Sequence, residues 1–238
     1  MTHGDLIVRS AQLSDASIVD IGIKDGRIFE VSTSSVNTYA EELDARGFCV
    51  LPSFVEPHAH LDKAFLADRV HNPAGDLMGA IRGLEAVRST ITHEDVVQRA
   101  TRAVRLMSQN GVTSIRTHAD TTISGGLSSI HALLEVKKNC AHFMDIQVAM
   151  LLEWPVTGLA GKEHQALARD AISVGIDVVG GCPHLDPDPR GAVDFLLNLA
   201  VESGLPLDLH ADENMRPDSS DLEHIADMVL RANLSHQI

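Results

Sequence analysis

The N-terminal fifth of the chain alternates apolar and polar residues with a period of two. The apolar members of the clearest run are Val19, Ile21 and Ile23. A second run follows at residues 27–31, after the pair Asp25-Gly26. A period of two is typical of a strand with one buried face, and Asp-Gly is a frequent hairpin turn. We therefore predict a β-hairpin within a small N-terminal β-sandwich segment over residues 1–50, with a polar loop at residues 32–42.

From about residue 48 the pattern changes to apolar runs that alternate with segments of helical periodicity. The expected strands are residues 48–55, 112–118, 146–153, 176–182 and 205–210. The expected helices are residues 92–109, 127–140, 163–174, 190–203 and 219–233. Repeated alternation of strand and helix indicates parallel strands joined by right-handed crossovers. We therefore expect an α/β fold with about five β/α units.

Two architectures contain such units, and the residues after the first strand separate them. An open doubly wound sheet typically has a Gly-rich phosphate turn at that point, whereas this chain continues with Glu56-Pro57-His58. The other architecture, a closed (β/α) barrel of the TIM type, needs eight units. We therefore predict an incomplete TIM-type barrel over residues 51–238, which stops after about strand five and its helix.

Histidines occur at or near the ends of four predicted strands. His58 and His60 follow the first strand, and His118, His184 and His210 follow three later ones. Residues i and i+2 of a strand point to the same side, so His58 and His60 can present two imidazoles to one cation. The carboxyl ends of barrel strands meet at one face, where such folds build their sites. The spacing therefore indicates a metal site at that face.

The composition narrows the kinds of partner and compartment. A net charge of -14 without a basic cluster disfavours binding to nucleic acid or an anionic membrane. The three cysteines are too scattered for a disulfide framework, and the N-terminus has no signal-peptide pattern. We therefore expect a cytoplasmic protein that acts on a small molecule, and a homo-oligomer is compatible with these features.

The motifs around the histidines are similar to those of a known enzyme family. They read Pro57-His58-Ala59-His60-Leu61-Asp62-Lys63, Arg116-Thr117-His118-Ala119-Asp120, Gly181-Cys182-Pro183-His184 and Leu209-His210-Ala211-Asp212-Glu213. With the β-rich segment before them, they resemble the amidohydrolase superfamily of metal-dependent hydrolases. The most similar branch is the cytosine deaminase-like one, which includes N-isopropylammelide amidohydrolase-like enzymes. The resemblance covers residues 5–238, and it implies three more β/α units in a whole family member.

The resemblance also implies a role for each matching residue. His58, His60 and His210 match the ligands of a single divalent metal ion, zinc or iron, and Glu213 matches the family's proton shuttle. The expected substrate-binding residues are Lys63, His118, Asp120, Leu152, Glu153 and His184. The family's two remaining site residues, a His after strand six and an Asp after strand eight, find no match. We therefore expect this chain alone to be inactive.

The resulting interpretation is a metal-dependent amidohydrolase or deaminase that hydrolyses a C–N bond of a cytosine-like or triazine-like heterocycle. Cytosine itself is not expected, because Leu152 stands where cytosine deaminases carry a Gln, and leucine forms no hydrogen bond. One alternative is a cyclic amidase of the hydantoinase or dihydroorotase kind. Those enzymes use two metals bridged by a carboxylated Lys after strand four, whereas Cys182-Pro183-His184 offers none. Another alternative is a non-catalytic truncated fragment.

Overall fold

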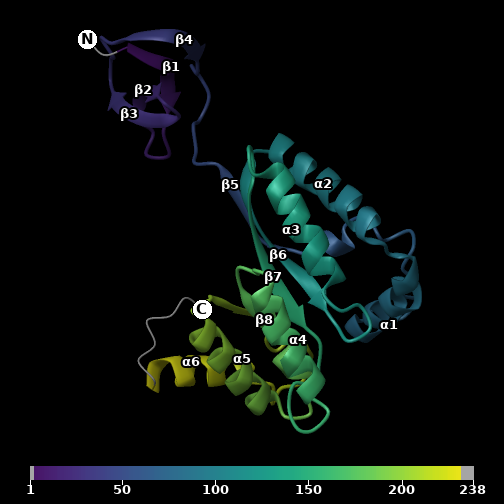
Figure 1. Ribbon diagram of the computed structural model, residues 1–238. Coiled ribbons are helices and arrows are strands. Elements are labelled where there is room, and N and C mark those ends of the chain that lie inside the picture. The colour runs from purple at the N-terminus through teal and green to yellow at the C-terminus, as the bar shows by residue number, and fades with distance from the viewer. Residues whose placement is uncertain (1–2, 232–238) are drawn as a thin grey trace. The chain divides into compact units, whose positions relative to one another are not determined.

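The computed structural model describes residues 3–231. The chain divides after Ser53 into two compact units (Figure 1). Among the described residues, no helix is both long and apolar enough to cross a membrane.

The N-terminal unit contains one four-stranded sheet. Its strands are β1 (His3–Gln12), β2 (Ile18–Lys24), β3 (Arg27–Ser32) and β4 (Thr38–Asp44), in the order β3-β2-β1-β4. β2 and β3 are antiparallel and joined at the Asp25-Gly26 turn, as the alternating pattern predicted. The described strands of this unit form this single sheet, so the second layer of the predicted sandwich stays a prediction.

The prediction of a polar loop at residues 32–42 is wrong, because strand β4 lies largely within that range. β4 pairs in parallel with β1, and most of its side chains are exposed. Pairing through main-chain hydrogen bonds does not require apolar side chains at an edge of a sheet. A strand of this kind therefore shows no hydrophobic alternation in the sequence.

The second unit is an α/β fold whose parallel sheet curls like half of a barrel (Figure 1). Its strands, in sequential order, are β5 (Phe54–Ala59), β6 (Val112–Thr121), β7 (Asp145–Leu152), β8 (Val179–Gly181) and β9 (Leu207–Leu209). The α-helices are α1 (Leu77–Val87), α2 (His93–Gln109), α3 (Ser128–Cys140), α4 (Lys162–Ser173), α5 (Pro189–Ser203) and α6 (Asp221–Arg231). Three short 3₁₀ helices follow strands or α1: η1 (Leu61–Lys63), η2 (Arg88–Thr90) and η3 (Pro183–Leu185). The predicted alternation of strands and helices is therefore confirmed.

One face of this sheet packs against the helices. Ile115 of β6 and Val148 of β7 are buried there, together with Leu133 of α3 and Leu196 of α5. The alternate positions of the strands point to the other face, which carries polar side chains. Arg116 and His118 lie on that face of β6, two residues apart.

The predicted starts and ends of the elements differ from the structure in places. The first strand was predicted as buried over residues 48–55, but β5 begins at Phe54, whose side chain is 56% exposed. β5 lies at an edge of the described sheet, so a neighbouring strand covers it on one side only. The helix α1 was not predicted. The helix expected to reach residue 233 is described as far as Arg231, and the positions after it lie outside the described residues.

Candidate metal centre and adjoining pocket

The ends of β5, β6 and β9 bring histidines together on the polar face of the sheet. His58 lies in β5 and His60 directly follows that strand, while His210 follows β9. The backbone N–H of His210 donates to the carbonyl of Gly181 at 3.0 Å, which continues the pairing of β9 with β8. Parallel pairing therefore carries residues 150 positions apart in the chain to one location.

His58, His60 and His210 form a compact group, which we call the histidine trio. The Nε2 atoms of His58 and His60 are 3.2 Å apart, and those of His60 and His210 are 3.3 Å apart. Two ligands about 2.0–2.1 Å from a tetrahedral ion lie about 3.3–3.4 Å from each other. The spacing of the trio therefore fits a common cation.

Burial keeps two members of the trio in the neutral form. Burial lowers the pKa of His60 to about 3, and the nearby ammonium of Lys63 adds to the effect. Burial likewise lowers the pKa of His210 to about 4. A neutral imidazole has a lone pair for a metal, whereas a protonated one does not. His60 and His210 can therefore both bind a cation at neutral pH.

A second group adjoins the trio and includes a residue that the sequence analysis missed. Asp208 lies on β9 two residues before His210, and its Oδ2 accepts from Arg116 at 2.8 Å. His118 is fully buried, with its ring centroid 4.6 Å from that of His58. Potential ligand atoms of His58, His118 and Asp208 lie within 4.8 Å of one another. The i, i+2 spacing of Asp208 and His210 is the signal that could have identified Asp208.

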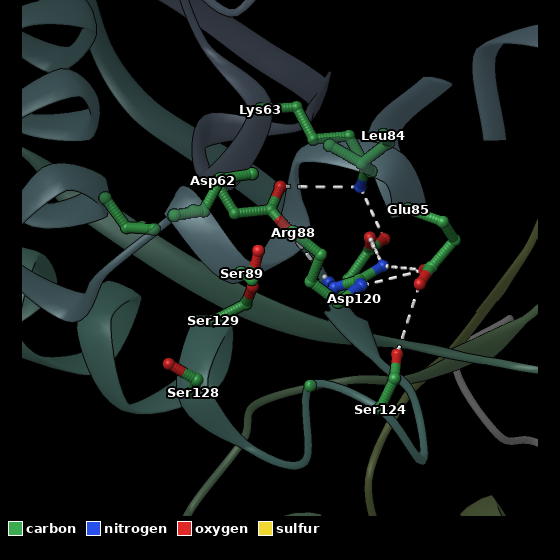
Figure 2. Close-up of a pocket in the computed structure, with 13 residues that line it drawn as sticks. Asp62, Lys63, Leu84, Glu85, Arg88, Ser89, Asp120, Ser124, Ser128 and Ser129 are labelled. Carbon is green, nitrogen blue, oxygen red and sulfur yellow. Dashed lines mark hydrogen bonds and ion pairs between the residues drawn. The ribbon is translucent and has the colours of Figure 1, made fainter. Parts of the chain in front are cut away.

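The predicted substrate residues Lys63 and Asp120 meet in a network of charges (Figure 2). This network adjoins the trio, because Lys63 Nζ lies 3.5 Å from His60 Nδ1. Lys63 Nζ lies 2.5 Å from Asp120 Oδ1 and 3.5 Å from Asp62 Oδ1. Arg88 contacts Asp120 at 3.3 Å and Glu85 at 2.5 Å. Burial disfavours the ammonium of Lys63, but the two carboxylates outweigh burial and raise its pKa. Lys63 is therefore charged and held in one place. Arg88 and Glu85 were not predicted from the sequence, because their spacing is not distinctive.

The trio opens into a pocket of about 450 Å³. Its polar lining includes His58, His60, Lys63, Asp120, Glu153, His210 and Glu213, and its apolar lining includes Leu66, Val70, Leu77, Ile81, Leu84, Leu152 and Trp154. The apolar part comes largely from α1 and the segment before it. The pocket thus joins a cation-binding edge to an apolar wall.

His118 and His184 are not among the residues that line this pocket. His118 is buried against the trio, with its ring centroid 4.6 Å from that of His58 and 4.7 Å from that of His210. His184 is buried, and its Nδ1 donates to the carbonyl of His210 at 2.8 Å. His184 therefore holds the backbone of a trio member. Leu152 is 1% exposed, and Glu153 accepts from the backbone of Ile123 at 2.9 Å.

Comparisons with known proteins agree with this geometry. No family model matches the chain. The chain is 31% identical over 219 residues to N-isopropylammelide isopropyl amidohydrolase of Pseudomonas sp. (strain ADP). The matched region covers 87% of this chain and 53% of the relative. The chain is also 29% identical over 226 residues to pterin deaminase of Rhizobium rhizogenes (strain K84 / ATCC BAA-868). This matched region covers 92% of this chain and 50% of the relative.

A solved structure supports the same relationship. The 5-methylcytosine deaminase from Klebsiella pneumoniae, liganded with 5-fluorocytosine, superposes with a TM-score of 0.85 at 32% identity, over 95% of this chain and 56% of that chain. The chain spans about half the length of the curated relatives it matches. These relatives confirm the resemblance inferred from the motifs, which is to the cytosine deaminase-like branch of the amidohydrolase superfamily.

Proposed function

We propose that this protein is a metal-dependent amidohydrolase or deaminase, which hydrolyses a C–N bond of a cytosine-like or triazine-like heterocycle. The observation that carries the proposal is the histidine trio, whose Nε2 atoms lie 3.2 and 3.3 Å apart at the edge of a pocket. The names of the relatives support the class of substrate, since they specify an ammelide derivative, a pterin and 5-methylcytosine.

The trio would hold one divalent cation, zinc or iron, because imidazole suits both metals. When bound, the cation would supply Lewis acidity that lowers the pKa of a water molecule toward neutrality. A single ion is favoured over a bridged pair, because the segment after β8 reads Cys182-Pro183-His184 and contains no Lys. That segment therefore argues against the cyclic amidase alternative.

The remaining roles fall to side chains that line the same pocket. Glu213 would accept the proton released from water and deliver it to the leaving nitrogen. Lys63, fixed by its ion pairs, would orient a polar edge of the heterocycle. Leu152 and the wall from α1 would exclude water from the ring. Each role belongs to a different residue, so the roles can be tested separately.

The proposal extends to the architecture and the partners. We propose that the five-stranded sheet is the first part of a (β/α)₈ barrel and that the N-terminal sheet is one layer of a β-sandwich. The substrate is a small molecule, because a net charge of -14 disfavours nucleic acid and anionic membranes. We further propose a cytoplasmic protein, with a homo-oligomer as a compatible state.

Catalysis is best tested in a chimaera, because the chain covers 53% of the N-isopropylammelide relative. The chimaera joins residues 1–231 to the part of that relative which the chain does not match. Loaded with Zn²⁺ or Fe²⁺, it should release ammonia or an amine from ammelide-like, pterin or cytosine-like substrates. Failure to hydrolyse any of them, with one metal ion bound per chain, would contradict the proposal.

The substitution Glu213→Gln tests the proton carrier in the same chimaera. It should leave the metal content unchanged and lower the rate by roughly 10² to 10⁴. Glu202→Gln, at an exposed position of α5, is the matched control and should change neither quantity. If Glu213→Gln removes the metal together with the activity, Glu213 is a ligand or a structural residue instead.

A further inference from the structure

His118 is a buried histidine, and no hydrogen bond among the described residues accounts for the burial of its ring nitrogens. Its side chain is fully buried, and neither Nδ1 nor Nε2 has a hydrogen-bond partner within residues 3–231. The described residues already shield both ring nitrogens of His118 from solvent, so a bound ion or water molecule must lie among those residues. A buried polar group without a partner is rare in native proteins and requires an explanation, such as a bound ion or water.

The ring of His118 lies near two side chains that can bind a cation, Asp208 and His58. Its Nε2 lies 3.8 Å from Asp208 Oδ2, too far for a direct hydrogen bond but close enough for both atoms to contact one ion. The ring of His58 is 4.6 Å away, centroid to centroid. Potential ligand atoms from His58, His118 and Asp208 all lie within 4.8 Å of one another.

We propose that His58, His118 and Asp208 form a second ligand set for a first-row divalent cation, which adjoins the histidine trio and which we call the inner set. Two imidazoles and a carboxylate suit Zn²⁺, Fe²⁺ or Co²⁺. Asp208 supplies the negative charge that the trio lacks. Arg116 pairs with the same carboxylate at 2.8 Å, and a carboxylate has enough lone pairs to contact both cations.

The inner set and the trio share His58, which limits how they are used. A neutral imidazole has one nitrogen lone pair. The two sets are therefore alternative positions for one ion rather than two sites filled together. The proposed function enters this inference only in the assumption that the trio is the principal position. Metal stoichiometry should remain one per chain in the unmodified protein.

The double variant His60→Ala/His210→Ala isolates the inner set, because it removes two of the three trio ligands. Binding is followed by Co²⁺ absorption and by direct metal analysis, which do not depend on catalysis. The double variant should still bind one Co²⁺ per chain, at least about 10-fold more weakly than the unmodified protein. Adding His118→Gln, or separately Asp208→Asn, should abolish this remaining binding.

The matched control is His131→Gln in the same double variant, because His131 is an exposed residue of α3. It should leave Co²⁺ binding unchanged, and circular dichroism should show that each variant is folded. The proposal is overturned if the folded double variant binds no Co²⁺. It is also overturned if His118→Gln and Asp208→Asn leave binding unchanged, because a water molecule then accounts for the buried nitrogens. Neither result bears on turnover by the chimaera, so failure of the inner set and failure of the proposed function are distinguishable.

Discussion

Leu152 lies at the end of β7, where its side chain is buried and contributes to the lining of the pocket. A leucine neither donates nor accepts a hydrogen bond, so it cannot bind a polar edge of a base. A pocket that lacks a hydrogen bond of this kind loses discrimination of about 10⁴ or more. We therefore expect the chimaera to turn over cytosine far more slowly than its best substrate.

The substitution Leu152→Gln should raise kcat/KM for cytosine relative to that substrate, as measured by ammonia release. Leu151→Gln, at the neighbouring pocket position, is the control and should have a smaller effect. Efficient cytosine deamination by the unmodified chimaera would show that Leu152 does not set the specificity.

The sequence could predict the convergence of the trio, because i, i+2 spacing and the ends of parallel strands are local signals. It could not predict that His118 and Asp208 both adjoin the trio. That arrangement depends on the pairing of β6 through β9, which sets the relative heights of residues 90 positions apart. Nor could it predict that His184 contacts a backbone carbonyl, since local periodicity carries no information about that contact.

At the scale of elements, the strands of the N-terminal unit are tied together by one side chain that crosses the sheet. Tyr39 of β4 donates its hydroxyl to Glu30 of β3 at 2.6 Å, although these strands lie at opposite edges. A Cβ at Gly4 would lie 2.7 Å from the Tyr39 ring, and one at Gly22 would also collide with it. The two glycines therefore allow the ring to lie directly on the backbone of β1 and β2.

We expect a dependence on pH from this contact. Hydrogen bonds from Tyr39, Ser35 and Asn37 lower the pKa of Glu30 from 4.5 to about 2. A carboxyl with a lowered folded-state pKa stabilises the fold above its unfolded-state value, and this stabilisation is lost as the pH falls through the folded-state value. Glu30→Gln should therefore destabilise the unit at pH 7, and the difference should disappear between about pH 4.5 and 2.

The signal for this experiment is the absorbance of Tyr39, the one tyrosine in the chain, during denaturation at several pH values. Burial and the hydrogen bond to Glu30 raise the pKa of Tyr39. Glu30→Gln should therefore also lower the pKa of the Tyr39 phenol toward its ordinary value of 10. Glu41→Gln, an exposed position on β4, is the control. Equal stability of Glu30→Gln and the unmodified protein at pH 7 would contradict the prediction.

Elements with a regular apolar period were predictable, and those held by polar contacts were not. The helix predicted from residue 92 is α2, and the hydroxyl of Thr92 accepts from the backbone N–H of Asp95 at its start, at 3.2 Å. In contrast, β4 has an exposed polar face, and α1 begins after a loop at the Asp76 cap. For β4, the decisive interaction is main-chain pairing, which leaves no apolar period in the sequence. α1 does have such a period, with Leu77, Ile81 and Leu84 at i, i+4 and i+7, so this helix could have been predicted and was not.

At the scale of the molecule, the described sheet has two open edges. β5 pairs only with β6, and β9 pairs only with β8. Unpaired backbone groups at a sheet edge favour association with other chains. The trio, however, comes from β5 and from the residues that directly follow β5 and β9, and its three nitrogens converge without a further strand. Metal binding and catalysis should therefore separate when the 238-residue chain is studied alone.

We expect the 238-residue chain to bind one Zn²⁺ or Co²⁺ and to self-associate in light scattering. It should release no ammonia from cytosine, isocytosine or ammelide-like substrates, because a closed TIM-type barrel needs eight strands and the described sheet supplies five. The chimaera, whose added strands can pair with both edges, should be less associated and should turn over substrate with the same metal. Metal-dependent turnover by a monodisperse sample of the 238-residue chain would show that the five-stranded sheet is already a sufficient catalytic scaffold.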